Sequence, residues 1–476
     1  MKTSRFMIAA CACLAASLFG AEEIKPQLRA GAATANITPL MGVLLDGTIM
    51  QIGPAKHVHD ELHARCLVLE DGSTRLAFAI VDNTMISREV IDHAKNLVQE
   101  STGIPPGNVL ISATHSHSTP RAVTGLSEEP LHKEYLHYLA QRISEGIRRA
   151  VHDLAPAQIG WGSFEEPRYV QNRRWFVEGA ETRANPFGEN GERVVMNPGA
   201  QGLIKPAGPV DPQVFFISVQ HADGRPLALL ANYSLHYIGG IPGGTVSADY
   251  FGAYAVEVTR LLNAGQQDPA FVAMMSNGTS GDVNARNPAA EPGKTGPYQQ
   301  MKRVAADLAA GTVKALQSVK HRSDIRLATV STELVLGVRK PDAERLAWAE
   351  KNAFAGKKLV RLSRPQIYAR EALALVHLPD TVSIPMQAFC IGDLAITAIP
   401  NEVFAETGLA LKQASPFKGS TFTIELANGY YGYLPSAQQH QWGGYETWPA
   451  RSSMLEVEAE TKIRATALDL LQRLAK

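Results

Sequence analysis

Cysteine is scarce in this sequence, and neither sign of charge is in excess. Four cysteines occur in 476 residues, and none belongs to a Cys-x-x-Cys pair, so a thiolate-type zinc motif is absent. Lysine plus arginine and aspartate plus glutamate each number 46. Such a balance gives no overall field that would favour nucleic acid or an anionic membrane. We therefore expect no nucleic-acid partner.

Long apolar runs are absent except at the N-terminus. There, Lys2 and Arg5 precede the apolar run Phe6 to Phe19, and polar sequence follows, which is the pattern of an export signal. The run is too short to span a bilayer comfortably. We predict a signal peptide over residues 1–21, a periplasmic or secreted protein, and no transmembrane segment in the mature chain. A lipoprotein-type box ending at Cys11 is a weaker alternative, because the apolar stretch before it is very short.

Two cysteines remain outside the predicted signal. Cys66 and Cys390 each lie in a strand-like apolar run. One disulfide between them is possible in an oxidising compartment. Two separately buried thiols are at least as compatible with the sequence, since free cysteine packs as a small hydrophobe.

The sequence also lacks a fixed-period repeat, a low-complexity tract and a Pro/Ser-rich linker. Strand-like runs alternate with helical segments in the first third, which is typical of an α/β fold. Asp71-Gly72 and Asp223-Gly224 each separate two apolar runs, as in β-hairpins. We predict a single large α/β domain over residues 22–476, with mixed β-sheets flanked by helices. The charged helical segment 341–375 is predicted to be a peripheral insertion.

Two histidines follow a predicted strand in the middle of the first half. The strand begins at Val109, and His115 and His117 come at its end, before Pro120. If the backbone stays extended, alternate side chains point to the same side. Imidazole is a common zinc ligand, so the pair is a candidate metal platform. Two loop histidines with ordinary hydrogen bonds are the alternative interpretation.

Three further segments present polar side chains beyond a predicted strand. His236 follows the run Leu227 to Tyr233, and a long polar loop holds Arg173. The Gly/Asn-rich stretch Ser276 to Asn287 follows another buried run. Such loops often display reactive side chains and backbone N–H groups.

Several motifs, taken in order, resemble the catalytic domain of the neutral/alkaline non-lysosomal ceramidases. That family consists of secreted zinc amidases that cleave the N-acyl bond of ceramide. The motifs are Gly31 to Pro39, Ala113-Thr-His115-Ser-His117-Ser118, His236 with Ser247-Ala-Asp249, Pro400-Asn-Glu402-Val-Phe404, and Asn428-Gly-Tyr-Tyr-Gly-Tyr433 with Tyr445 downstream. Each is weak alone, and together they cover most of the mature chain.

The resemblance implies a set of zinc ligands and a set of reacting residues. The implied ligands are His115, His236, Glu402 and Tyr433. Histidine nitrogen and carboxylate oxygen are ordinary zinc donors, while a phenolate is unusual. On residue chemistry alone, Tyr433 is equally a packing tyrosine, and Glu402 equally a carboxylate at a helix start.

The implied reacting residues are His117, Arg173 and Tyr445, which match family positions that contact the amide. We expect them to transfer protons and stabilise an oxyanion. The alternative is that they only line the polar rim of the site. Asp82 and Asp249 are expected to orient the ligands.

The sequence departs from the family pattern in two places. Asn284 stands where the family has a serine, so a serine nucleophile at that position is excluded, although Asn284 still has a donor for an oxyanion. The sequence ends at the helix that closes the family's catalytic domain, so the C-terminal β-sandwich is expected to be missing.

The resemblance thus implies an exported, zinc-dependent amide hydrolase in which zinc-activated water cleaves an N-acyl bond. The expected partner is a small-molecule or lipid N-acyl substrate, with ceramide or another sphingolipid as the candidate. One alternative is a divergent, non-catalytic member that binds a ligand in the same pocket. Another is a metal-dependent amidohydrolase barrel, which needs eight strand–helix units and is disfavoured by the predicted hairpins.

Overall fold

A computed structural model of the chain describes residues 27–46, 51–125, 127–290, 295–353 and 362–476. The predicted signal peptide lies outside the described residues.

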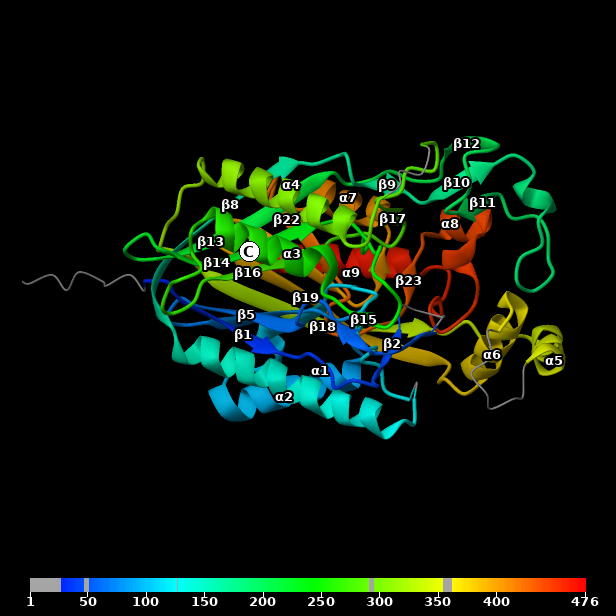
Figure 1. Cartoon of the computed structure of the whole chain (residues 1–476), viewed down its shortest axis with the longest axis horizontal. Helices are drawn as coiled ribbons and strands as arrows, with labels where there is room; N and C mark the ends of the chain where they lie inside the picture. Colours follow the sequence, from blue (N-terminus) through cyan, green and yellow to red (C-terminus); the bar gives the residue numbers. More distant parts are fainter. Residues whose placement is uncertain (1–26, 47–50, 126, 291–294, 354–361) are drawn as a thin grey trace, which may run out of the picture.

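An eight-stranded mixed sheet forms the larger of two β-layers (Figure 1). The strand order is β16-β14-β13-β8-β1-β5-β6-β7. The strands are β1 (Arg29–Asn36), β5 (His63–Glu70), β6 (Arg75–Val81), β7 (Val109–Ala113), β8 (Ala155–Glu165), β13 (Gln213–His221), β14 (Pro226–Tyr233) and β16 (Val272–Asn277). The β5–β6 and β13–β14 pairs are antiparallel, whereas β6–β7 and β14–β16 are parallel. The two predicted hairpins are confirmed, and the barrel alternative is wrong because its strands would all be parallel.

A four-stranded sheet packs face to face against the first. Its order is β18-β19-β20-β22, with bounds β18 (Leu327–Gly337), β19 (Thr381–Ile391), β20 (Leu394–Ile399) and β22 (Thr421–Glu425). Buried aromatic pairs join the two layers, with ring centroids 5.1 Å apart for Phe78 and Phe389 and 5.0 Å for Phe215 and Phe422. These residues belong to one apolar core shared by both sheets.

Helices cover the outer faces, which gives four layers. α1 (Arg88–Thr102) and α2 (Pro130–His152) pack on one half of the large sheet, and α3 (Asp249–Leu261) and α4 (Gln299–Leu316) pack on the other half. α9 (Ala459–Leu474) covers the small sheet, beside α7 (Ala405–Ala414). α5 (Ala343–Asn352) and α6 (Arg364–Val376) lie at the right-hand edge of Figure 1, as predicted for a peripheral insertion.

Short elements complete the described chain. They are β2 (Leu44–Asp46), β3 (Gln51–Pro54), β4 (His57–Val58), β9 (Gln171–Asn172), β10 (Arg174–Val177), β11 (Val194–Met196), β12 (Leu203–Pro206), β15 (Thr245–Val246), β17 (Val283–Asn284), β21 (Glu402–Val403), β23 (Tyr433–Leu434), α8 (Ala437–Trp442) and the 3₁₀ turns η1 (Pro106–Asn108), η2 (Ala180–Thr182) and η3 (Tyr445–Thr447). The predicted fold class, an α/β fold with mixed sheets flanked by helices, is confirmed.

The two cysteines are free and buried. Cys66 packs between β5 and the helices on the large sheet, whereas Cys390 belongs to the core under α9. The disulfide interpretation is therefore wrong, because the thiols lie in separate cores. Burial raises the pKa of the Cys66 thiol to about 12, which leaves it unreactive at neutral pH.

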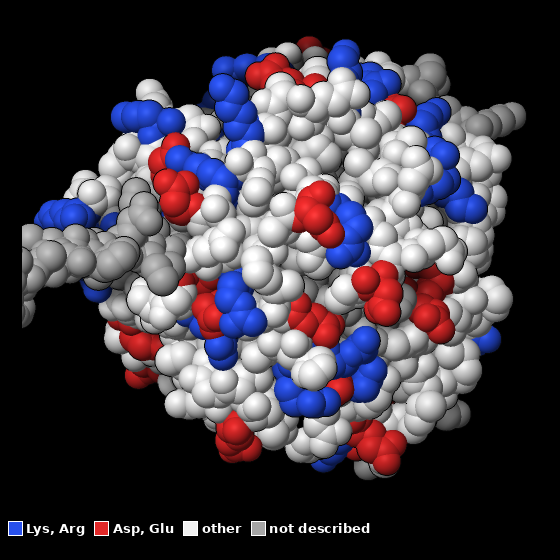
Figure 2. All heavy atoms as spheres, turned by 90° about the vertical axis from the view of Figure 1, so that its left-hand side faces the viewer, with Lys and Arg blue, Asp and Glu red and all other residues white. Residues whose placement is uncertain are grey.

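The surface reflects the balanced composition. On the face drawn in Figure 2, acidic and basic side chains are interspersed rather than gathered by sign. Within the described ranges, every helix is too short or too polar to cross a bilayer.

We predict that Phe389→Ala lowers the free energy of unfolding by about 3–5 kcal/mol, because it opens a cavity between the two sheets. Urea denaturation followed by circular dichroism measures this. Val256→Ala is the matched control, since Val256 is 70% exposed on α3, and its effect should stay within about 0.5 kcal/mol. Equal losses for the two variants would contradict the shared inter-sheet core.

Candidate metal centre

The predicted site residues follow strands whose C-terminal ends meet. His115 follows β7 and His236 follows β14, both in the large sheet, while Glu402 follows β20 in the small sheet. The segment after β22 joins the layers, since Ala113 N donates to Leu426 O at 3.2 Å. Ligands of α/β proteins commonly bind at the carboxyl ends of strands. The site therefore lies where the two sheets come together.

His115 sits in a turn, not in an extended strand. β7 ends at Ala113, and His115 has φ of +71°, a left-handed conformation uncommon for a residue other than glycine. Strain of this kind concentrates at functional sites. The prediction that the two histidines share one side of an extended backbone is therefore wrong. Their imidazoles converge nonetheless, with His117 Nε2 3.1 Å from His115 Nε2.

A third imidazole completes the cluster. His236 Nε2 lies 3.2 Å from His115 Nε2. One nitrogen from each of His115, His117 and His236 lies within 4.8 Å of the other two. Among the described residues, these three side chains are therefore close enough together to share one metal ion. The ring of His117 also stacks on Tyr237 at 3.7 Å between centroids, which holds its orientation.

Hydrogen bonds to carbonyl oxygens fix which nitrogen faces the centre. Nδ1 of His115 lies 2.9 Å from Thr84 O, and Nδ1 of His236 lies 2.8 Å from Ser280 O. A carbonyl oxygen only accepts, so each Nδ1 carries a proton, and in a neutral imidazole Nε2 then presents a lone pair. Two facing lone pairs repel unless a cation lies between them.

Burial and nearby charge favour the neutral form of the His236 and His117 imidazoles. Burial lowers the pKa of His236 well below its ordinary value, and the neighbouring charge of Arg173 lowers it further. Burial and the neighbouring His115 also lower the pKa of His117. Neutral imidazole is the form that binds metal ions.

One carboxylate oxygen of Glu402 faces the cluster and accepts no hydrogen bond from the described chain. Its Oε2 lies 3.3 Å from His115 Nε2 and 3.6 Å from His236 Nε2, and within the described chain it has no hydrogen-bond partner although it is fully buried. The other oxygen, Oε1, accepts from the Tyr430 hydroxyl at 3.1 Å. An unsatisfied buried carboxylate oxygen is costly unless a cation compensates it.

The donor set fits a tetrahedral cation. Zinc bonds of about 2.0–2.1 Å place neighbouring ligand atoms about 3.3–3.4 Å apart. The separations among His115, His236 and Glu402 are 3.2, 3.3 and 3.6 Å. Tyr433 lies next to Glu402, because β21 and β23 pair these two residues. Burial and the nearby Glu402 raise the pKa of Tyr433 well above its usual value, so its phenolate form would need a cation beside it.

Arg173 lies against the cluster and is held by a carboxylate that the sequence did not single out. Its Nη1 lies 3.0 Å from His236 Nε2, and its Nε donates to Glu446 Oε1 at 2.8 Å. Arg174 Nη1 donates to the other Glu446 oxygen at 2.6 Å. Burial opposes ionisation of Glu446, but Arg174 and Arg173 outweigh it and lower its pKa. Nη2 of Arg173 is left buried without a partner in the described chain.

Tyr445 lies beside Tyr433. It opens the turn η3, and its ring meets the Tyr433 ring edge-on at 5.7 Å. The Trp448 ring also meets the Tyr445 ring edge-on, with centroids 5.9 Å apart.

Asn284 is tied to the loop that carries Arg173. Its Nδ2 donates to Asn197 Oδ1 at 2.6 Å, and Asn197 N donates to Arg173 O at 2.7 Å. No hydrogen bond among the described residues joins Asn284 to the three imidazoles.

The expectation that Asp82 and Asp249 orient the ligands needs correction. Asp82 accepts from the Arg65 guanidinium at 2.7 Å, and Asp249 accepts from Ile238 N and Gly239 N at 3.1 and 2.8 Å. Neither carboxylate contacts an imidazole, because backbone carbonyls occupy both Nδ1 positions. Asp249 braces the turn that follows His236 and also accepts from Tyr250 N at 2.6 Å.

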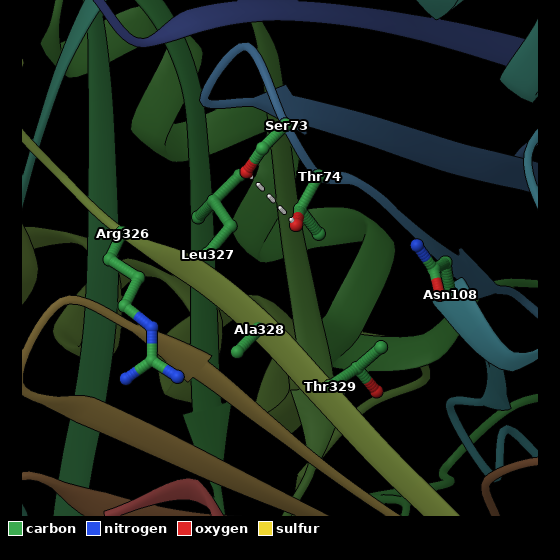
Figure 3. A pocket seen from close by; sticks show the side chains of 7 residues that line it. All are labelled: Ser73, Thr74, Asn108, Arg326, Leu327, Ala328 and Thr329. Carbon is green, nitrogen blue, oxygen red and sulfur yellow. Dashed lines mark hydrogen bonds between the residues drawn. The ribbon is translucent and has the colours of Figure 1, made fainter. Parts of the chain in front are cut away.

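A surface pocket lies at the opposite end of β7. Figure 3 shows its lining of Ser73, Thr74, Asn108, Arg326, Leu327, Ala328 and Thr329. Asn108 directly precedes β7, whereas His115 follows it, so this pocket is separate from the metal centre.

Comparison with known proteins identifies the family. Residues 29–305, more than half of the chain, match the model of the family described as neutral/alkaline non-lysosomal ceramidase, N-terminal. The chain belongs to this ceramidase family.

Individual ceramidases are similar at lower coverage. Neutral ceramidase B of Dictyostelium discoideum is 24% identical over 195 residues, which is 39% of this chain but only 25% of that relative. The crystal structure of neutral ceramidase from Pseudomonas aeruginosa superposes with a TM-score of 0.67 at 17% identity, over 94% of this chain and 74% of that one. A structure described as ceramidase complexed with C2 gives 0.68 at 16% identity, over 94% and 75%. These likenesses establish a ceramidase fold.

We predict that Glu446→Gln destabilises this ceramidase homologue by about 3–5 kcal/mol, because two buried guanidinium groups lose their shared counter-charge. Glu145→Gln is the control, since its ion pair with Arg148 lies on the surface and contributes about 1 kcal/mol at most. Denaturant titration at pH 7 measures both.

The pH dependence gives a second check on Glu446. Its pKa is lowered from 4.5 in the folded state, so its stabilisation is present above pH 4.5 and is lost as the pH falls through the lower, folded-state pKa. The difference between wild type and Glu446→Gln should therefore shrink below pH 4.5. A pH-independent difference would contradict the assignment.

Proposed function

We propose that this chain is a zinc-dependent hydrolase that cleaves an N-acyl amide bond, with ceramide or a related sphingolipid as the substrate class. The observation that carries the proposal is that the Nε2 atoms of His115 and His236 lie 3.3 and 3.6 Å from Glu402 Oε2, which has no hydrogen-bond partner in the described chain. Membership of the ceramidase family supports the reaction class. The proposal includes export to the periplasm or the medium, supported by the sequence pattern of residues 1–21, with residues 22–476 as one catalytic domain.

The zinc ligands in this proposal are His115, His236, Glu402 and Tyr433. Zinc bound there would lower the pKa of water toward neutrality and polarise an amide carbonyl. The chain's own part is to orient both imidazoles through their Nδ1 bonds, and to leave Glu402 Oε2 without a competing donor.

His117 is the proposed proton carrier. Its imidazole is neutral because burial lowers its pKa, so Nε2 can accept the proton that water loses as the new carbon–oxygen bond forms. Returning that proton to the amide nitrogen lets the carbon–nitrogen bond break and releases a carboxylic acid and an amine. The stacked Tyr237 keeps the ring in place for both transfers.

Arg173 and Tyr445 are the proposed stabilisers of the oxyanion. Nη2 of Arg173 is a buried donor without a partner in the described chain, which suits a charge that develops only during reaction. The Tyr445 ring lies against Tyr433, where its hydroxyl can assist proton transfer. Asn284 is proposed to support the Arg173 loop through Asn197, with a remaining amide hydrogen for the substrate.

A second candidate is a binding protein that has kept the pocket and lost turnover. The specific observation in its favour is that Asn284, at the position where the motif leads us to expect a serine, is bound to Asn197. Incubating the purified protein with zinc and a panel of N-acyl amides, lipid and non-lipid, separates the two candidates. We expect hydrolysis of at least one member. Absence of hydrolysis with zinc confirmed by metal analysis would favour the binding protein.

Two variants test the division of roles. We predict that His115→Ala loses both zinc and activity, because it removes a ligand. His117→Ala should keep zinc and lose about 10²–10⁴-fold in kcat, the usual contribution of a positioned acid–base group. Metal content and kcat are measured on the same preparations. Loss of zinc from His117→Ala would assign His117 to the ligand set instead.

A further inference from the structure

A fully buried carboxylate at the end of β22 takes no part in the chemistry above. Glu425 has no exposed surface. Its Oε1 accepts from Ser280 Oγ at 2.7 Å, and its Oε2 accepts from Val403 N at 2.7 Å and from Ser280 N at 3.3 Å. Both oxygens are therefore occupied by donors from two segments that are far apart in sequence.

These two segments hold the proposed ligands. Ser280 contacts His236 Nδ1 through its carbonyl oxygen at 2.8 Å and its hydroxyl at 3.3 Å, and Val403 directly follows Glu402. The segments also touch through the backbone, since Gly281 N donates to Val403 O at 2.8 Å. A Cβ atom on Gly281 would lie 2.5 Å from Glu402 O. No side chain fits between them.

The geometry points to Glu425 as a positioning residue that fixes His236 relative to Glu402 and thereby sets the affinity for zinc. His236 comes from the large sheet and Glu402 from the small one, so a movement between the layers would separate them. Glu425 opposes that movement because one carboxylate binds both supporting segments. The inference rests on the proposed zinc site.

Zinc affinity, measured by competition with a chelator, tests this role without reference to a substrate. Glu425→Gln keeps the side-chain volume but cannot accept all three hydrogen bonds. We expect its zinc affinity to fall about 10–100-fold, the usual effect of losing a contact that supports a ligand. Ser280→Ala, a milder change, should give a smaller fall because the carbonyl bond to His236 remains.

Asp71→Asn is the matched control. Asp71 is a buried carboxylate that accepts from Ser73 N, Thr74 N and Leu327 N, and it lies in the β5–β6 hairpin. We expect it to lose stability without losing zinc affinity.

In cobalt-substituted protein, the ligand-field absorption bands should change in Glu425→Gln and stay unchanged in Asp71→Asn, since only Glu425 sets the ligand geometry.

The outcomes separate this inference from the proposed function. Wild-type affinity retained by Glu425→Gln and Ser280→Ala would overturn the positioning role alone. A fall of equal size in Asp71→Asn would also overturn it, since the effect would then be one of general stability. Absence of zinc binding by the wild type would contradict the proposed function and the positioning role with it.

Discussion

The pairing of each Nδ1 with a backbone carbonyl is the constraint on which the centre depends. Thr84 O and Ser280 O accept the Nδ1 protons of His115 and His236, so the two Nε2 atoms are turned toward each other, 3.2 Å apart. These nitrogens and the unsatisfied Glu402 oxygen form a group of donor atoms that could hold a metal ion. The left-handed turn at His115 is one cost of this arrangement, and the packing of two sheets around it maintains the strain.

Buried ionic groups around the centre join segments that the sheets alone would not hold in register. Glu446 neutralises Arg173 and Arg174, so the guanidinium next to His236 keeps a defined position. Asp282 accepts from Ala405 N at 2.8 Å and Asn172 Nδ2 at 2.7 Å. It thereby ties the start of α7, after Glu402, to the residue before Arg173. Burial raises the pKa of Asp282 to about 6, so this carboxyl takes up a proton at a higher pH than an exposed aspartate does.

The sequence predicted the elements better than the contacts between them. Apolar period and turn residues identified the strands and hairpins, and strand-end position singled out His115, His117 and His236. Glu425, Glu446 and Tyr237 were missed because nothing in their local pattern distinguishes a buried partner from a surface residue. The direction of the His115 turn and the partners of Asp82 and Asp249 depend on tertiary packing, so no spacing rule predicts them.

Zinc-edge anomalous diffraction from crystals grown with zinc tests the central claim most directly. We predict one strong anomalous peak within about 2.0–2.3 Å of His115 Nε2, His236 Nε2 and a Glu402 carboxylate oxygen. A peak coordinated by other residues, or no peak at these atoms when zinc is in excess, would contradict it.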